Sequence, residues 1–183
     1  MKWIIASDIH GSELYCKEII KAFEKENAQK LLLLGDILYH GPRNDLPEGH
    51  NPKAVISILN EYKDKILYVR GNCDAEVDQM VLEFPIMSDY AVICQDGITI
   101  YATHGHLHGE DNPPPLSNGD ILLCGHTHVS ALRNHGEFTY MNPGSASIPK
   151  ENTHHGYMAF ENGIFIWKDF DGNEIMSYKH ENL

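Results

Sequence analysis

The sequence predicts an α/β fold, a four-layer α/β/β/α sandwich built around two mixed β-sheets. In the first half of the chain, continuous apolar runs alternate with segments of helical periodicity, which is typical of parallel strands covered by helices. In the second half, short apolar runs follow one another and hairpin signals join them, which predicts antiparallel pairing as well. The 183 residues contain no internal repeat and no long linker, so one domain is expected over residues 1–183.

The first half supplies three strands and two helices. Ser12 can cap a helix, because apolar side chains recur on one face of the segment that follows it. Asn51 is a second cap, and Pro52 takes the first helical position, where its missing N–H is not needed. Strands are expected at the three continuous apolar runs, residues 3–7, 31–34 and 66–69.

The second half is expected to form a series of short strands. Asp96-Gly97 and Asn162-Gly163 indicate hairpin turns, because these dipeptides tolerate positive φ. Long loops are expected at residues 39–50 and 107–119, and we expect both to form walls of a pocket. The strands are expected at residues 90–94, 98–103, 121–124, 138–141, 157–160 and 164–168.

The composition is acidic, and this charge limits the classes of molecule that the protein is expected to bind. The net charge is −12, from 26 acidic and 14 basic side chains, which disfavours extended nucleic acid and membrane surfaces. A small anionic substrate is compatible with this charge, because bound metal ions would invert the sign locally. The amino-terminal apolar run stops at Asp8, so it resembles neither a signal peptide nor a membrane span. The 4 cysteines lie far apart and form no CxxC pair, and because no secretory signal is seen, reduced thiols and a cytoplasmic location are expected.

Side chains that can bind metal follow five of the expected strands, at the point where each strand ends. Because the carboxyl ends of strands in an open α/β sheet converge on one crevice, we expect these side chains to meet there. Alternate residues of an extended segment point the same way, so Asp8 and His10 can reach one metal cluster, as can His126 and His128. The candidate metal ligands are Asp8, His10, Asp36, Asn72, His104, His126 and His128.

The chemistry of these candidates favours a pair of ions. Imidazole and carboxylate ligands without thiolate suit Mn²⁺, Fe²⁺, Co²⁺ or Zn²⁺ in a hydrolytic site. So many ligands exceed the needs of one tetrahedral ion, and they suit two ions about 3.5–4 Å apart that share a bridging carboxylate. Taken singly, each of these residues could instead be a helix cap, a turn residue or an ordinary polar histidine. Metal binding is favoured because all of them follow strand ends in one chain.

These blocks, in this order, resemble the signature of the calcineurin-like metallophosphoesterases. Two further segments, Gly41-Pro42-Arg43-Asn44 and Asn142-Pro143-Gly144-Ser145, resemble the small YfcE-type phosphodiesterases of that family. The resemblance covers residues 1–149. The signature blocks are Asp8-x-His10, Gly35-Asp36, Gly71-Asn72-x-Asp74, His104 and Gly125-His126-x-His128.

The resemblance implies a division of the ligands between two ions. Asp8, His10 and His128 would hold the first ion. Asn72, His104 and His126 would hold the second, and Asp36 would bridge the two. A hydroxide between the ions would then attack the phosphorus of a small organic phosphodiester. Mn²⁺ is the expected ion, with Fe²⁺, Zn²⁺, Co²⁺ and Ni²⁺ as alternatives, and self-association into a homo-oligomer stays open.

One block departs from the pattern of many family members. They carry a histidine that acts near the leaving group, where this chain carries Cys73. A thiol is a poor general acid for an alkoxide at neutral pH, so we expect a preference for diesters whose leaving group needs little protonation. The candidate catalytic residues are Asn72, Cys73 and His104, and Arg43 and Asn72 are candidates for binding the substrate.

Several alternatives stay open at this point. His106 or His108 could take the place of His104 as a ligand, and His106 could serve as the general acid. Asp74 is expected to cap a helix that begins near Ala75 and to orient a ligand. The alternative functions are a phosphomonoesterase and a metal-binding scaffold protein on the same fold. A metallo-β-lactamase-type hydrolase would need a His-x-His-x-Asp-His cluster, which this chain lacks.

Overall fold

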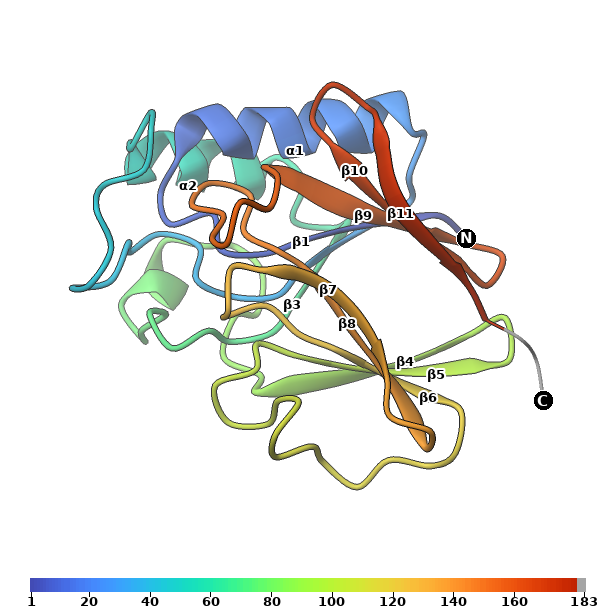
Figure 1. Cartoon of the computed structure of the whole chain (residues 1–183). Coiled ribbons are helices and arrows are strands. Elements are labelled where there is room, and N and C mark those ends of the chain that lie inside the picture. Colours follow the sequence, from blue (N-terminus) through green and yellow to red (C-terminus); the bar gives the residue numbers. More distant parts are fainter. Residues whose placement is uncertain (181–183) are drawn as a thin grey trace.

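Two β-sheets lie face to face, and two α-helices lie against the outer side of one of them (Figure 1). The computed structural model describes residues 1–180. The helices are α1 (Glu13–Lys25), α2 (Pro52–Asn60) and the short 3-10 helix η1 (Asp78–Met80). The strands are β1 (Trp3–Ala6), β2 (Lys30–Leu33), β3 (Ile66–Tyr68), β4 (Tyr90–Gln95), β5 (Ile98–Thr103), β6 (Asp120–Leu123), β7 (Ser130–Asn134), β8 (Phe138–Pro143), β9 (Gly156–Glu161), β10 (Ile164–Asp169) and β11 (Glu174–Lys179).

Both sheets are mixed, which confirms the predicted fold class. The first has the order β11-β10-β9-β1-β2-β3, with β1, β2 and β3 parallel and the other pairs antiparallel. The second has the order β4-β5-β6-β8-β7, with β5, β6 and β8 parallel. The parallel strands therefore form the centre of the second sheet and one half of the first. Their carboxyl ends supply the loops that carry the candidate ligands.

Apolar side chains fill three regions between these layers. One region lies between the first sheet and the helices, and a second lies between the two sheets. The outer side of the second sheet is covered by loop residues, with Leu116 packed against Leu122, Cys124 and Tyr140. The loop over residues 107–119 therefore serves as an outer layer of the sandwich, where the first sheet has helices.

The predicted helix starts are confirmed by their hydrogen bonds. The Ser12 hydroxyl accepts the backbone N–H of Tyr15 at 3.3 Å, and the Asn51 side chain accepts that of Ala54 at 3.4 Å. These bonds satisfy N–H groups that have no partner inside the helix. The helix starts are thus fixed locally.

The sequence patterns missed two strands, β7 and β11. Both lie at the edge of a sheet, and both expose polar side chains. In β7 only Ala131 is fully buried, and in β11 no side chain is. An edge strand is defined mainly by its backbone pairing with one neighbour, so it leaves little apolar pattern in the sequence.

A partly buried ion-pair network joins α1 to the first sheet. The Glu26 side chain, 15% exposed, lies 3.0 Å from the Lys2 amino group and also pairs with Lys168. Burial raises the pKa of Glu26, but the two ammonium groups lower it by more. The pKa of Glu26 therefore lies below its ordinary value. A carboxylate with a lowered folded-state pKa stabilises the fold above its unfolded pKa, and that stabilisation disappears as the pH falls through the folded pKa.

We therefore expect Glu26→Gln to lower the free energy of unfolding by about 1 kcal/mol at neutral pH. The difference from wild type should shrink between about pH 5 and pH 3 as the carboxylate becomes protonated. Denaturant unfolding across this range measures it. Glu18→Gln is the control, since Glu18 pairs only with the exposed Lys21 on the same helix. A Glu26→Gln difference that stays constant with pH would contradict the role of the ion pairs.

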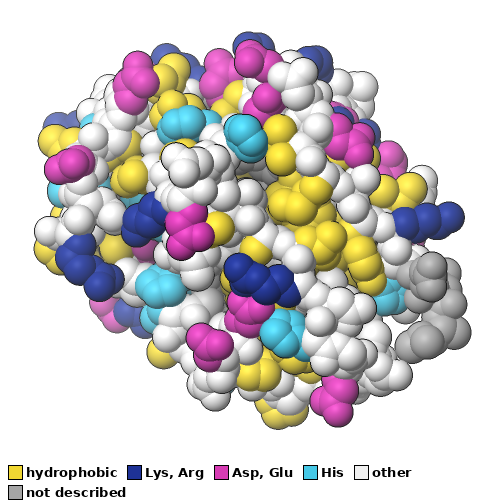
Figure 2. Space-filling view, viewed as in Figure 1, with side chains coloured by type: hydrophobic (Ala, Val, Ile, Leu, Met, Phe, Trp, Pro, Cys, Tyr) yellow, Lys and Arg dark blue, Asp and Glu magenta, His cyan; other side chains and the backbone are white. Residues whose placement is uncertain are grey.

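The surface carries mixed charges. On the face drawn in Figure 2, basic side chains are scattered among acidic ones and are not gathered into one stripe. Within residues 1–180, no helix is both long and apolar enough to cross a membrane.

Candidate metal centre

The backbone turns sharply at the strand ends that carry the candidate ligands. Five of these residues have positive φ, a conformation that is uncommon for any residue other than glycine. Two neighbouring glycines allow the loops to approach closely. A Cβ atom on Gly71 would lie 2.1 Å from Asp36 Oδ1, and one on Gly125 would lie 2.0 Å from Ser7 Oγ. The five residues are Asp8 (56°), His10 (51°), Asp36 (57°), His126 (68°) and His128 (63°).

These turns bring two carboxylates and three imidazole rings into one buried group. Asp8 Oδ1 lies 3.3 Å from His128 Nε2 and 3.7 Å from His10 Nε2. Asp36 Oδ2 lies 3.5 Å from His104 Nε2 and 3.8 Å from His10 Nε2. All five side chains are buried. His10 thus contacts both carboxylates, so the group is continuous.

Hydrogen bonds fix the tautomer of each of the three histidines. The Nδ1 atoms of His10, His128 and His104 lie 2.7, 2.8 and 2.6 Å from the backbone oxygens of Tyr39, Ile148 and Leu34. A carbonyl oxygen can only accept, so each Nδ1 carries a proton and each neutral ring has its lone pair on Nε2. This arrangement orients histidines as metal ligands.

The resulting donor set fits divalent cations. The Nε2 atoms of His10 and His128 face each other at 3.2 Å, and two lone pairs at that distance need a positive charge between them. Asp8 Oδ1 is buried and accepts no hydrogen bond from any described residue. Burial lowers the pKa of His104, but Asp36 and Asp8 raise it by more, to about 9, so without a metal ion a proton on Nε2 supplies the positive charge that these carboxylates favour. Three overlapping trios of side chains have the spacing of metal ligands, namely Asp8-His10-His128, His10-Asp36-Cys73 and Asp8-Asp36-His104.

Two predicted ligands lie at the more open side of the group. Asn72 Oδ1 lies 3.0 Å from His104 Nε2, and its side chain is exposed. His126 is half-buried, and its ring centroid lies 5.0 Å from that of His104, outside the three trios. Of the three alternating histidines, His104 is the one in the buried group. The His106 ring lies 5.3 Å from His104, and neither His106 nor His108 belongs to a trio.

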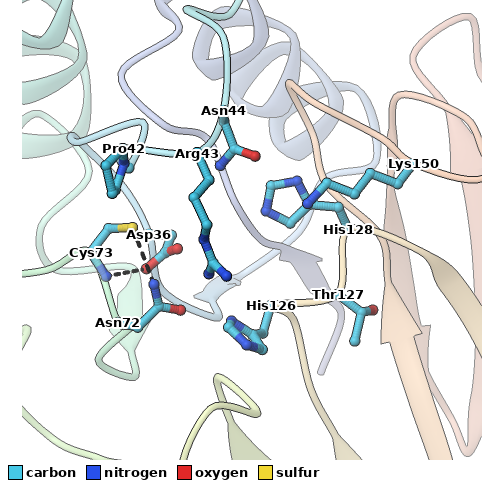
Figure 3. A pocket seen from close by; sticks show the side chains of 11 residues that line it. Asp36, Pro42, Arg43, Asn44, Asn72, Cys73, His126, Thr127, His128 and Lys150 are labelled. Carbon is cyan, nitrogen blue, oxygen red and sulfur yellow. Dashed lines mark hydrogen bonds between the residues drawn. The ribbon is translucent and has the colours of Figure 1, made fainter.

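A cavity of about 430 Å³ opens onto this group. Figure 3 shows Arg43 reaching into it, with Cys73, Asn72 and Asp36 on one side and His126 on the other. Burial and then Asp36 raise the pKa of the Cys73 thiol to about 12. The predicted walls are half right. Residues 41–44 line the cavity, but residues 107–119 do not, because that loop packs over the second sheet.

The wall opposite Cys73 was missed in the sequence. Thr127 and Lys150 line it, together with His128 (Figure 3). Lys150 belongs to the loop between β8 and β9, and it follows the Asn142-Pro143-Gly144-Ser145 segment in the chain. A lone loop lysine carries no pattern of its own, so only the fold reveals its place.

The Asp74 carboxylate ties two of the site loops together. It accepts the backbone N–H groups of Asp36 at 3.0 Å, Ile37 at 3.1 Å and Gly71 at 2.6 Å, and the Tyr68 hydroxyl also donates to it. The expectation that Asp74 caps a helix at Ala75 is wrong. The nearest helix begins at Asp78, and the Asp74 side chain turns inward to the ends of β2 and β3.

A second set of buried polar side chains supports Asp8. The hydroxyls of Ser145 and Ser147 donate to the Asp8 backbone oxygen at 2.8 and 2.9 Å. The Asn142 amide donates to the backbone oxygen of Gly125 at 2.7 Å, just before His126. The Asn142–Ser145 segment therefore holds the loops that carry the candidate ligands.

Two mixed sheets packed face to face, with carboxylates and histidines gathered at the strand ends, define a class of metal-dependent hydrolases. A family model described as the calcineurin-like phosphoesterase superfamily domain matches residues 1–162. The chain therefore belongs to the calcineurin-like phosphoesterase superfamily, and it is a hydrolase.

Individual relatives agree with this family. The phosphodiesterase YfcE of Escherichia coli (strain K12) is 45% identical over 164 residues, which cover 90% of this chain and 89% of YfcE. The probable metallophosphoesterase YsnB of Bacillus subtilis (strain 168) is 27% identical, with 96% of this chain and 95% of YsnB covered.

Solved structures show the same fold. The structure of the E. coli phosphoesterase Yfce has a TM-score of 0.96 at 42% identity, with 99% of this chain and 100% of that chain covered. Vacuolar Protein Sorting 29 from Cryptosporidium parvum has a TM-score of 0.62 at 16% identity, with 97% of each chain covered, and this likeness concerns the fold alone.

Proposed function

We propose that this chain hydrolyses small organic phosphodiesters with two divalent metal ions. The observation that carries the proposal is the buried group around Asp8 and Asp36, in which three histidines direct Nε2 lone pairs toward two carboxylates. The relative YfcE is named a phosphodiesterase, which supports a diester as the substrate. Residues 1–183 would act as one domain.

The ligands divide as the family resemblance implies. Asp8, His10 and His128 would hold one ion, and they form one of the three trios. Asn72, His104 and His126 would hold the other, and Asp36, which belongs to two trios, would lie between the ions. Divalent cations held there would supply an activated water at neutral pH and offset the negative charge on the phosphoryl oxygens. We propose Mn²⁺, with which imidazole and oxygen donors are compatible, and Fe²⁺, Zn²⁺, Co²⁺ and Ni²⁺ are the alternatives on the same donors.

The chain's own side chains would bind and orient the substrate. Arg43 points into the cavity, where its guanidinium can donate two hydrogen bonds to a phosphate. The Asn72 amide lies beside His104 at the mouth of the buried group, where it can also contact the phosphate. The Cys73 thiol stays protonated at neutral pH because its pKa is about 12, so it is a weaker general acid for an alkoxide leaving group than a histidine with a pKa near neutral.

The direct test is hydrolysis of bis(p-nitrophenyl) phosphate by the purified protein with Mn²⁺. We expect activity that falls about a thousandfold when a chelator removes the metal and that returns when Mn²⁺ is added back. Phosphomonoester substrates measured in parallel test the alternative of a phosphomonoesterase. Equal rates with and without the chelator, or no hydrolysis of any phosphate ester, would overturn the proposal and favour the scaffold alternative.

The thiol at position 73 predicts a dependence on the leaving group. Wild type should cleave aryl diesters much faster than dialkyl diesters, whose alkoxide needs a proton. Cys73→His supplies an acid near neutral pH and should raise the rate on dialkyl diesters about tenfold or more, with little gain on aryl diesters. Cys73→Ser is the control for the loss of sulfur. If the histidine variant gains nothing on dialkyl diesters, the proposed effect of Cys73 is wrong.

A further inference from the structure

Two basic side chains line the cavity from separate loops, and neither forms an ion pair with another described residue. Arg43 enters from the loop between β2 and α2, and Lys150 extends toward the cavity from the loop between β8 and β9 (Figure 3). Within residues 1–180, neither has a carboxylate oxygen within 4.0 Å. Some other basic residues, such as Lys2, Lys168 and Arg133, pair with glutamates. The unpaired charge of Lys150 is therefore available to a ligand.

The backbone of Lys150 is fixed relative to the candidate metal centre. Its N–H donates to the backbone oxygen of His128 at 2.9 Å, and its own oxygen accepts the N–H of Thr153 at 3.0 Å. The two residues between Lys150 and Thr153 have φ values of 52° and 58°, as in a tight turn. The same loop supplies the carbonyl of Ile148 that fixes the His128 ring. The backbone of Lys150 is thus held in place by hydrogen bonding to His128, which is a proposed metal ligand.

The side chains that line the cavity are less acidic than the chain as a whole. The net charge is −12, yet among the described residues that line the cavity Asp36 is the only carboxylate. A phosphodiester carries one negative charge, and the proposed metal ions and Arg43 already bind that phosphate. Lys150 lines the cavity from another loop, on the wall opposite Cys73, and we expect it to face a part of the substrate that extends beyond the phosphate.

We propose that Lys150 determines specificity by binding a second anionic group of the substrate. The substrate class is a phosphodiester in which one of the two alcohols carries a carboxylate or a further phosphate. A positive charge at the wall of a cleft favours ligands of opposite charge and disfavours cationic ones. This inference rests on the proposed function, because it assumes that the cavity binds a phosphodiester.

A set of four diesters with the same p-nitrophenyl leaving group tests the proposal. The second alcohol is 2-methoxyethanol (neutral), glycolate (a carboxylate), 2-hydroxyethyl phosphate (a phosphate) or choline (a cation). We expect kcat/KM for the two anionic diesters to exceed that for the choline diester about tenfold, and to fall toward it as salt is added. Calorimetric titration with non-cleavable phosphonate analogues of the glycolate and choline diesters gives the same comparison without turnover.

Variants of Lys150 identify the source of this preference. In Lys150→Met the ratio of kcat/KM for the glycolate and choline diesters should fall about three- to tenfold. In Lys150→Glu the choline diester should become the better of the two. Lys65→Met is the control, because Lys65 is exposed at the opposite end of β3 and should leave every rate unchanged. Comparing kcat/KM for the glycolate diester with that for the 2-hydroxyethyl phosphate diester shows whether a carboxylate or a second phosphate is preferred.

The outcomes separate this inference from the function on which it depends. If wild type does not hydrolyse even the neutral diester with Mn²⁺, the proposed function fails. If it hydrolyses all four diesters at similar rates, or if Lys150→Glu keeps the wild-type order, the diester function stands and the role of Lys150 is wrong.

Discussion

Asp36→Asn is expected to lower kcat/KM on an aryl diester by about a thousandfold or more and to reduce bound Mn²⁺ from two ions per chain to at most one. Asp36 belongs to two of the three trios, and its Oδ2 lies within 3.8 Å of both His10 and His104. An amide keeps the shape of the side chain and loses its charge, so neither ion would keep its bridging carboxylate. Steady-state kinetics and metal analysis after gel filtration measure the two effects.

Asp64→Asn is the matched control for Asp36→Asn. Asp64 is exposed just beyond α2, and its change of charge is the same. We expect wild-type metal content and wild-type rates in this variant. Circular dichroism checks that Asp36→Asn is folded. A folded Asp36→Asn protein that binds two Mn²⁺ ions and retains a tenth of wild-type activity would remove Asp36 from the metal centre.

Asp74→Ala is expected to lower the free energy of unfolding by about 3 kcal/mol or more. The change leaves the buried N–H groups of Asp36, Ile37 and Gly71 without their acceptor, and each such loss costs about 1–3 kcal/mol. For a chain of this size, 3 kcal/mol corresponds to a fall in Tm of about 6–12 °C. Thermal and denaturant unfolding of the metal-free protein measure the effect.

Two further variants make the Asp74 result interpretable. Asp78→Ala removes an aspartate that accepts a single backbone N–H, that of Ala75 at 2.9 Å, so it should cost only about 0.5–1.5 kcal/mol. Asp74→Asn keeps one acceptor oxygen and should lie between wild type and Asp74→Ala, which matters if the alanine variant does not fold. A Tm for Asp74→Ala within about 2 °C of wild type would show that the network does not hold the loops.

The sequence was most informative where a strand is buried and ends in a polar side chain. The runs that became β1, β2 and β3 are continuous and apolar, and five of the predicted ligands do meet in one buried group. Asn72 and His126 lie beside that group, and metal binding by any of the seven residues stays a prediction. The caps at Ser12 and Asn51 were also predictable, because capping depends only on neighbouring residues.

Features that depend on contacts between distant segments could not be predicted. Asp74 was expected to cap a helix, because the sequence does not show that its carboxylate turns inward to Asp36 and Gly71. Lys150 gave no signal, because its place on the cavity wall depends on a bond to His128. The loop at residues 107–119 was assigned to the pocket by its length, whereas the apolar side chain of Leu116 draws it over the second sheet.

The left-handed backbone at five candidate ligands affects the choice of substitutions at these positions. Holding a residue with a Cβ atom in that conformation costs roughly 1–2 kcal/mol, and asparagine and aspartate bear it better than most residues. Alanine at His10 or His128 would therefore remove a ligand and also change the local backbone preference, so two effects would be mixed. Asparagine at the same position keeps the loop geometry accessible and isolates the loss of the imidazole. If asparagine relieves backbone strain at His10 or His128, the metal-free variant should have a higher Tm than the metal-free wild type. That change would be measured separately from any change in metal content.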